Sequence, residues 1–286
     1  MAEYDKFMNS IKEKSDATKK QYRIQYNKLF QLTNKPIAES SEKKIIEILD
    51  SMGNKNNSQA LLNIALLVRK MEGLSVDQLL ARRKKDKDKL IQDVKQKNVE
   101  LRENLPSYND IVEYMDYLYE KGEWTDFIIN YLLINLQVRN QDLDFEIVSR
   151  KRDTSDKDKN YMWLQTTKGK ATFIRNVYKT AVIHAPDGEP HGYGQKVNNI
   201  TDERFITALR RVSSFQKADS DKGTFIPNKS AIAYYIQKST YKQLGEGKYF
   251  KIIVNHFRND VDKLKEISEN RGTDLKTIHA FYDIEK

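Results

Sequence analysis

The sequence contains no cysteine, and this absence excludes several kinds of chemistry. Disulfide bonds, zinc fingers and cysteine nucleophiles all need a thiol. A reducing compartment is compatible with the absence. The four histidines show no metal-ligand spacing, so the sequence indicates no metal site. They are His184, His191, His256 and His279.

Long apolar runs are also missing. The longest are Ala60–Val68 and Phe127–Leu136, which contain polar residues and are too short to span a bilayer. The N-terminal segment MAEYDKFMNSIKEK has no apolar h-region, so we expect no secretory signal. These features predict a soluble, intracellular protein without a membrane partner, located in the cytoplasm or nucleus, or in a virion.

Two motifs for phosphate chemistry are absent as well. No segment fits the GxxxxGK[ST] pattern of a P-loop. No paired-carboxylate cluster stands out among the 41 acidic residues, which argues against a two-metal nuclease.

What the sequence does have is an excess of positive charge. Fifty lysine and arginine residues against 41 aspartate and glutamate residues give a formal net charge of +9. This excess favours a polyanionic partner, of which nucleic acid is the commonest. Because many basic proteins bind no nucleic acid, charge alone leaves the partner open.

The order of patterns predicts two domains joined by a basic linker. Residues 1–80 read as a helical domain, in which Ser15 caps a helix whose Lys19, Lys20 and Arg23 lie largely away from its apolar face. Residues 81–104 are almost continuous charge and indicate a solvated helix or linker. Its Arg82, Arg83 and Lys84 either contact phosphates or keep an exposed linker soluble.

Residues 105–286 read as a second, larger domain. We expect helices from Ser107 and Trp124, then a strand at Phe145–Ser149, then the runs YMWLQTT and ATFIRNVY joined by a glycine turn. Helices follow after Thr201. The fold class is therefore predicted as mainly α with a small, three-stranded antiparallel sheet, an α+β arrangement.

The C-terminal stretch predicts a long amphipathic helix from Lys248, a break at 271–273 around Gly272, and a short helix that ends at Tyr282. Read alone, Tyr282 is either a packed cap of a terminal helix or a nucleophile, and packing is the more ordinary role. A phenol can attack phosphorus without a metal and form a covalent phosphotyrosine. That reaction needs fixed cations, best supplied by arginine, and a proton donor such as lysine.

The sequence resembles the tyrosine recombinase (integrase) family in three segments placed in the family's order. LQVRNQDLDFEIV is similar to its first box and puts Arg139 at the first catalytic arginine and Asp142 at the supporting acid. TTKGK puts Lys168 at the hairpin lysine. EISENRGTDLKTIHAFY is similar to the turn and tyrosine helix, with Gly272 as the turn glycine and Tyr282 as the nucleophile.

The resemblance implies a DNA-cleaving and rejoining enzyme that needs no metal or nucleotide cofactor. Tyr282 would form a covalent 3′-phosphotyrosine, Arg139 would stabilise the transition state, and Lys168 would protonate the leaving oxygen. The N-terminal half resembles the family's core-binding domain, which clamps duplex DNA with the catalytic domain. Recombination or integration of viral or mobile-element DNA would then need a homotetramer on double-stranded DNA. Lys170 and Arg271 would contact the DNA.

The second box departs from the family's His-x-x-Arg pattern. Here the segment reads Lys248-Tyr249-Phe250-Lys251, so Lys248 and Lys251 would take the places of histidine and arginine. Lysine lacks the planar fork that binds phosphate in a bidentate manner. Thr273 stands where the family has histidine or tryptophan after the turn glycine.

Three alternatives therefore stay open. The chain could have the same fold with a disabled site and serve as a DNA-binding or genome-organising protein. It could be an unrelated α-rich basic module whose similarities are coincidental. A type IB topoisomerase, which shares the chemistry, is a variant of the enzyme hypothesis.

Overall fold

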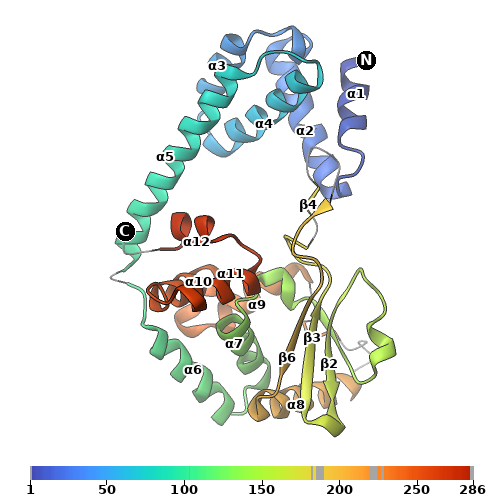
Figure 1. Ribbon diagram of the computed structural model, residues 1–286, viewed down its shortest axis with the longest axis vertical. Coiled ribbons are helices and arrows are strands. Elements are labelled where there is room, and N and C mark those ends of the chain that lie inside the picture. The colour runs from blue at the N-terminus through green and yellow to red at the C-terminus, as the bar shows by residue number, and fades with distance from the viewer. Residues whose placement is uncertain are drawn as a thin grey trace. The chain divides into compact units, whose positions relative to one another are not determined.

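The computed structural model describes residues 2–102, 104–181, 183–184, 190–218, 224–226 and 229–283. Its internal contacts divide the chain into two compact units, Met1–Asp93 and Val94–Lys286 (Figure 1). Helix α5 (Asp77–Arg102) runs through the boundary and contains most of the segment predicted as a linker. The predicted domain bounds stay a prediction.

The described part of the first unit is helical, as the sequence indicates. Ser15 Oγ accepts a hydrogen bond from Thr18 N at 3.3 Å, which confirms the predicted N-cap of α2. Helix α4 buries Leu61, Ile64 and Val68 at the centre of the unit. Besides α5, the helices are α1 (Ala2–Ser10), α2 (Asp16–Thr33), η1 (Ile37–Glu39), α3 (Glu42–Asp50) and α4 (Lys55–Met71).

Helix α6 of the second unit begins at the predicted position. Ser107 Oγ accepts from Asp110 N, and the Asp110 carboxylate accepts from Ser107 N, so a capping box starts α6. The helices are α6 (Tyr108–Glu120), α7 (Trp124–Leu136), α8 (Glu203–Ala218), α9 (Ile232–Ser239), α10 (Gly245–His256), α11 (Val261–Arg271) and α12 (Leu275–Phe281). Helix α7 is buried on nearly all sides and forms the centre of this unit's core.

A small four-stranded sheet lies beside these helices, in the order β1-β2-β3-β6. Its strands are β1 (Phe145–Val148), β2 (Asn160–Gln165), β3 (Lys170–Arg175) and β6 (Lys196–Ile200). The predicted hairpin is confirmed, because β2 pairs antiparallel with β3 and Gly169 takes a left-handed φ of 57° at its turn. Helix α8 packs against β2 and β3 (Figure 1).

Two details of the predicted sheet were wrong. The sheet is mixed, because the loop between β1 and β2 is long enough to return the chain to the same end and pair the strands in parallel. It also has a fourth strand, β6, which the sequence did not reveal. The segment KVNNI is mostly polar, and its strand character comes from pairing with β3 rather than from apolar alternation.

Short elements complete the described chain. The two-residue strands β4 (Ile183–His184) and β5 (Pro190–His191) pair with each other. The remaining 3-10 turns are η2 (Asn140–Leu143), η3 (Lys151–Thr154), η4 (Thr166–Lys168), η5 (Lys229–Ala231) and η6 (Tyr241–Gln243).

The predicted long C-terminal helix is two helices. Helix α10 ends at His256, and α11 begins after Asp260, whose carboxylate accepts from Lys263 N at 2.9 Å. A side-chain cap of this kind starts a new helix where the apolar pattern alone suggested continuity. The predicted break is confirmed, since Gly272 ends α11 with φ 65° and ψ 49°.

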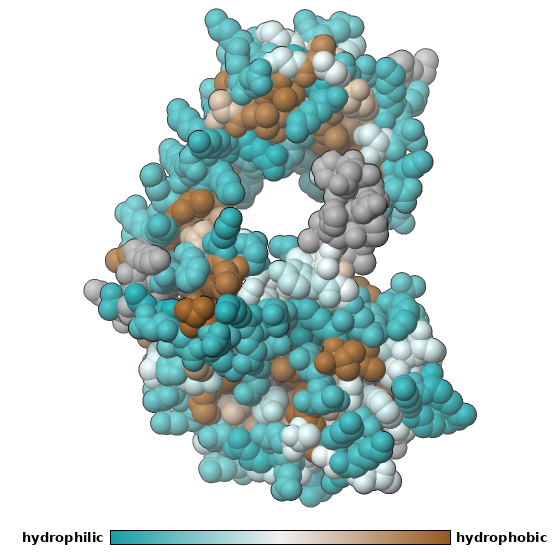
Figure 2. Space-filling model, in the orientation of Figure 1, coloured by the Kyte–Doolittle hydropathy of each residue, from teal (hydrophilic) through white to brown (hydrophobic). Residues whose placement is uncertain are grey.

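The surface is largely polar. Hydrophilic residues cover most of the face shown in Figure 2, with scattered apolar patches. Within the described residues, no helix combines the length and the apolar character that a membrane crossing requires.

Candidate functional site

Arg139 lies at the first turn after α7, where the main chain is held by Asp142. Gln137 ends α7 in the left-handed region, and Arg139 N then donates to Asp142 Oδ2 at 3.0 Å. Asp142 is 1% exposed and also accepts from Arg175 Nη1 at 3.4 Å. This carboxylate therefore fixes the position of the Arg139 backbone and joins it to strand β3.

The guanidinium of Arg139 uses only part of its donor capacity. Its Nη2 donates to Thr273 Oγ1 at 2.7 Å and to Gly272 O at 3.4 Å. Its Nη1 is buried and meets no hydrogen-bond acceptor within the described residues. Burial, together with repulsion from Arg271, lowers the pKa of Arg139. An arginine nevertheless keeps its charge, so a partly buried cation remains with one buried donor unmatched.

Tyr282 lies close to this cation although 142 residues separate the two in the chain. Tyr282 is among the titratable groups that lie near enough to influence Arg139, together with Asp142 and Glu246. The phenol ring packs edge-on against Phe250 of α10, with ring centroids 4.7 Å apart. Tyr282 is the C-cap of α12, and its ring is partly buried.

Arg271, which we predicted as a DNA contact, is directed into the protein instead. It is 5% exposed and lies over the Phe250 ring at 4.3 Å. Its Nη1 donates to Gln137 O at 3.2 Å and Val138 O at 3.0 Å, and its Nη2 pairs with Glu246. Arg271 thus ties the end of α11 to the end of α7, and these protein partners occupy both terminal nitrogens of its guanidinium.

Two further cations stand beside Arg139 and were not predicted. Arg175 is 1% exposed and donates to Asn198 Oδ1 at 3.0 Å and to Asn270 O at 3.1 Å. Lys196 of β6 donates to Asn270 O at 3.1 Å and to Glu269 O. Burial, and then repulsion from Arg175, lowers the pKa of Lys196 to about 8.

These cations form what we call the basic cluster: Arg139, Arg175, Lys196 and Arg271. The carboxylates that form ion pairs with it in the described chain are Asp142 and Glu246. The cluster therefore retains an excess of positive charge around Arg139. No sequence motif marks Arg175 or Lys196, because each is defined by partners in distant elements.

The turn at Gly272 is enclosed by Thr180, Lys196 and Tyr178. Thr180 Oγ1 donates to Gly272 O at 2.9 Å. A Cβ added to Gly272 would lie 2.4 Å from Thr180 Oγ1 and 3.1 Å from Lys196 Nζ. Only glycine therefore allows both the left-handed turn and the close cover that holds Thr273 against Arg139.

Lys251 and Lys248 occupy a different neighbourhood. Lys251 Nζ donates to Asn98 Oδ1 at 2.5 Å, and burial, together with repulsion from Lys248, lowers the pKa of Lys251. Lys248 is exposed. Neither lysine is among the charged groups that act most strongly on Arg139.

The hairpin lysines lie at the surface. Lys168 is exposed in η4, and Lys170 is partly buried at the start of β3. Within the described residues, no hydrogen bond or ion pair joins either of them to the basic cluster. Of the four residues to which the resemblance gives roles at the phosphate, Arg139 and Tyr282 lie near each other, whereas Lys168 and Lys251 have other surroundings in the described chain.

The cations predicted to bind DNA in the first unit differ in whether they form ion pairs within the protein. Lys20 and Arg23 on α2 are exposed, as are Arg83 and Lys84 on α5. Lys19 pairs with Asp16 at 3.1 Å. Arg82 pairs with Asp50 and Asp86, and these hydrogen bonds raise its pKa. Its charge is accordingly matched within the protein.

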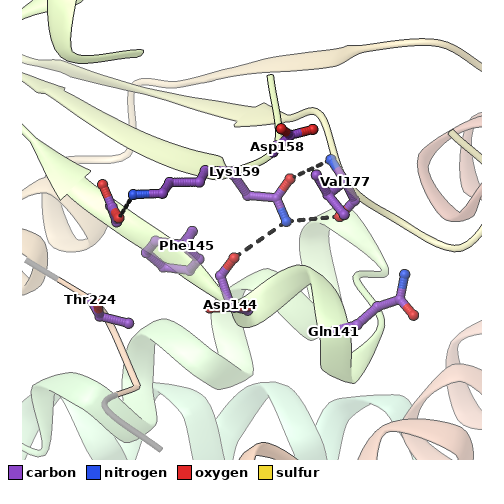
Figure 3. Close-up of a pocket in the computed structure, with 9 residues that line it drawn as sticks. Gln141, Asp144, Phe145, Asp158, Lys159, Val177 and Thr224 are labelled. Carbon is purple, nitrogen blue, oxygen red and sulfur yellow. Dashed lines mark hydrogen bonds and ion pairs between the residues drawn. The ribbon is translucent and has the colours of Figure 1, made fainter. Parts of the chain in front are cut away.

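A cavity of about 370 Å³ opens beside β1 (Figure 3). Its charged groups are mainly acidic, and its one lysine, Lys159, pairs with Glu146 at 2.8 Å. Asn160 bridges its wall by donating to Val177 O and Asp144 O. Acidic walls repel a polyanion, so this cavity is not a site for DNA. It is lined by Gln141, Asp144, Phe145, Glu146, Asp158, Lys159, Asn160, Val177 and Thr224.

The described residues contain no group of histidine, aspartate and glutamate side chains arranged to hold a metal ion.

Comparison with known proteins gives one distant likeness. No protein-family profile matches the sequence, and no curated protein matches it. Among solved structures, the chain is similar to one described as "Crystal structure of XerA recombinase", at 12% identity and a TM-score of 0.39. The alignment covers 99% of this chain and 93% of that one. A likeness at this identity and score carries no argument about what the chain does.

Proposed function

We propose that this protein cleaves and rejoins double-stranded DNA through a covalent 3′-phosphotyrosine on Tyr282, in the manner of a tyrosine recombinase. The observation that carries the proposal is the Arg139 guanidinium. It is a partly buried cation beside Tyr282, its buried Nη1 meets no acceptor in the described chain, and the surrounding cluster has excess positive charge. A phosphate oxygen is the partner that such a donor fits best.

The reaction balances without a metal or a redox step. The Tyr282 phenol gives its proton to water, its oxygen forms a bond to phosphorus, and the bond from phosphorus to the 5′ oxygen breaks. Arg139 donates to a nonbridging oxygen as charge develops there, and a lysine ammonium gives a proton to the leaving 5′ oxygen. Attack by a 5′ hydroxyl reverses these steps and rejoins the strand.

Two lysines are candidates for the proton donor. Lys168 is the candidate that the resemblance implies, and it is exposed on the hairpin. Lys196 lies in the basic cluster, and its pKa of about 8 suits a donor that works near neutral pH. Replacing each by methionine in separate variants distinguishes them, because the true donor is bypassed by a substrate whose 5′ leaving group is a thiolate, which needs no proton.

A second candidate function is DNA binding or genome organisation by a site that no longer cleaves. The observation that favours it is that two other cations already bind protein groups. Arg271 pairs with Glu246, and Lys251 donates to Asn98. If these contacts persist on DNA, the transition state keeps one free arginine donor where two cationic ligands are expected.

A trapping experiment separates the two. The protein is incubated with a nicked duplex that loses the short 5′ fragment after cleavage, and a denaturing gel is examined for protein linked to DNA. The proposed enzyme gives an adduct that disappears in Tyr282→Phe while DNA binding is retained. A control, Tyr234→Phe, changes an exposed tyrosine of α9 and leaves the adduct intact.

Other outcomes are equally informative. DNA binding with no adduct from any substrate contradicts the enzyme and supports the disabled site. An adduct that survives in Tyr282→Phe moves the nucleophile to another residue. Absence of DNA binding even at low salt contradicts both functions and supports an unrelated basic module. The proposed homotetramer is tested by the mass of the complex on a two-site DNA.

A further inference from the structure

Asn98 reverses the usual pattern of burial on helix α5. It is 1% exposed, whereas its neighbour Val99 is 54% exposed. A polar side chain that is buried while an adjacent valine faces solvent needs a specific set of hydrogen bonds to offset its lost hydration. Asn98 belongs to the part of α5 that lies in the second unit.

The partners of Asn98 are the two carbonyls on either side of Tyr282. Its Nδ2 donates to Phe281 O at 3.1 Å and to Asp283 O at 3.2 Å. The last carbonyls of a helix have no partner within the helix, so an external donor at the end of α12 satisfies groups that would otherwise be unpaired. In Figure 1, α12 accordingly lies beside the last turns of α5.

Lys251 sets the orientation of this amide. Its Nζ donates to Asn98 Oδ1 at 2.5 Å. Because an ammonium group can only donate, the oxygen of the amide must face Lys251 and the NH2 group must face the two carbonyls. Burial lowers the pKa of Lys251, as expected for an amine enclosed at this contact.

Helix α10 therefore holds Tyr282 in two ways. Phe250 contacts the phenol ring directly, and the next residue, Lys251, acts on the main chain through Asn98. Tyr282 N also donates to Ile278 O at 2.9 Å, so the backbone is held on both sides of the ring.

We infer that Asn98 is a positioning residue that fixes the main chain at Tyr282, and that Lys251 acts by orienting the Asn98 amide. This role rests on the proposed function of Tyr282, because what it positions is the nucleophile. It assigns Lys251 to the tyrosine segment rather than to the phosphate. Small displacements of a reacting group cost rate steeply, up to about a hundredfold for about 1 Å.

The test combines a rate with a signal that needs no activity. Asn98→Asp is nearly isosteric but cannot donate, so it places a carboxylate against two carbonyl oxygens. Asn98→Ala removes the amide, and Gln96→Ala removes an exposed amide from the same helix as the matched control. We expect the adduct to form about 10- to 100-fold more slowly in both Asn98 variants, with DNA affinity and the Gln96→Ala rate unchanged.

The second readout is the ¹⁹F resonance of 3-fluorotyrosine placed at position 282 alone. In the unaltered protein we expect a resonance shifted from that of an unfolded chain by the Phe250 ring. In Asn98→Asp and Asn98→Ala it should move toward the unfolded position, and in Gln96→Ala it should not. An unchanged resonance in both Asn98 variants overturns the inference.

Lys251→Met distinguishes the two roles for that lysine. If Lys251 orients Asn98, this variant shifts the fluorine resonance in the absence of DNA. A slower adduct with an unshifted resonance contradicts the inference and returns Lys251 to the phosphate. If the unaltered protein forms no adduct but its resonance responds to Asn98→Asp, the proposed enzyme fails while the positioning role stands.

Discussion

At the scale of single residues, the proposed function depends most on Arg139. Its backbone is held by Asp142 and its side chain by Thr273, so it is positioned without help from DNA. Leaving a buried polar donor unmatched costs about 1–3 kcal/mol, and more when the group is charged, so such a donor needs an explanation such as a catalytic role or a bound water or ion. Arg139 is thus held in place with Nη1 unmatched in the described chain, as the proposed contact with a phosphate requires.

Lys196 gives a prediction about pH at the same scale. Its pKa is lowered from 10.5 to about 8, so between these values the unfolded chain binds a proton that the folded protein has released. The free energy of unfolding therefore rises with pH relative to a variant without the amine. From pH 7 to pH 9.5 we expect the unaltered protein to gain about 1 kcal/mol over Lys196→Met, after allowance for solvent screening.

Urea denaturation followed by tryptophan fluorescence measures this difference. Both tryptophans, Trp124 and Trp163, lie in the unit that contains Lys196, so the signal reports on that unit. Lys179→Met, which changes an exposed lysine, is the control and should show no such trend. A pH-independent difference for Lys196→Met would mean that the amine is solvated.

At the scale of elements, the site depends on how α11 ends. Gly272 turns the chain so that its carbonyl and Thr273 meet Arg139, while Thr180 covers the turn from the other side. Arg271 links the same helix end to α7. The turn is therefore the junction at which three separate elements define the position of one guanidinium.

Replacing Gly272 tests this junction. Gly272→Ala should lower the free energy of unfolding by about 2–4 kcal/mol, because it adds both a left-handed penalty and a clash with Thr180. Gly169→Ala is the matched control: its φ is 57°, but nothing lies within 4 Å of the added carbon. It should cost about 1 kcal/mol. Equal losses in urea denaturation would contradict the close cover over Gly272.

At the scale of the whole molecule, the 50 lysine and arginine residues are spread over both units, and the 41 acidic residues leave a net charge of +9. DNA affinity should fall with salt in proportion to the cations that contact phosphates. Free cations contribute to that slope, whereas cations already paired within the protein contribute less. Exposed and paired cations of α5 can therefore be compared to test whether this helix contacts DNA.

Arg82 and Arg83 are adjacent residues that differ in this respect. Arg83 is exposed, while Arg82 is paired with Asp50 and Asp86. If α5 contacts DNA, Arg83→Gln should reduce the slope of log affinity against log salt by about 0.9, and Arg82→Gln should reduce it much less. Fluorescence anisotropy over a salt series measures both. An equal loss, or none, would remove this part of α5 from the interface.

Much of the local structure was predictable from residues close together in the chain. Ser15 and Ser107 start helices through hydrogen bonds to residues three positions ahead, and Gly169 marks a hairpin turn. The same kind of local signal was missed at Asp260, because the apolar pattern continues across it. Arg139, Asp142 and Tyr282 were chosen by their order and residue types, and their roles stay a prediction.

The sequence by itself determined the helical first unit, the hairpin, the glycine break and the basic charge, because each depends on neighbouring residues or on composition. Only the tertiary structure decided that β6 joins the sheet, that Arg175 and Lys196 stand beside Arg139, and that Asn98 holds the segment around Tyr282. The reason is physical: burial and hydrogen bonding of a polar side chain depend on partners far along the chain. Asn98 reads as one more polar residue in a charged helix until its carbonyl partners are seen.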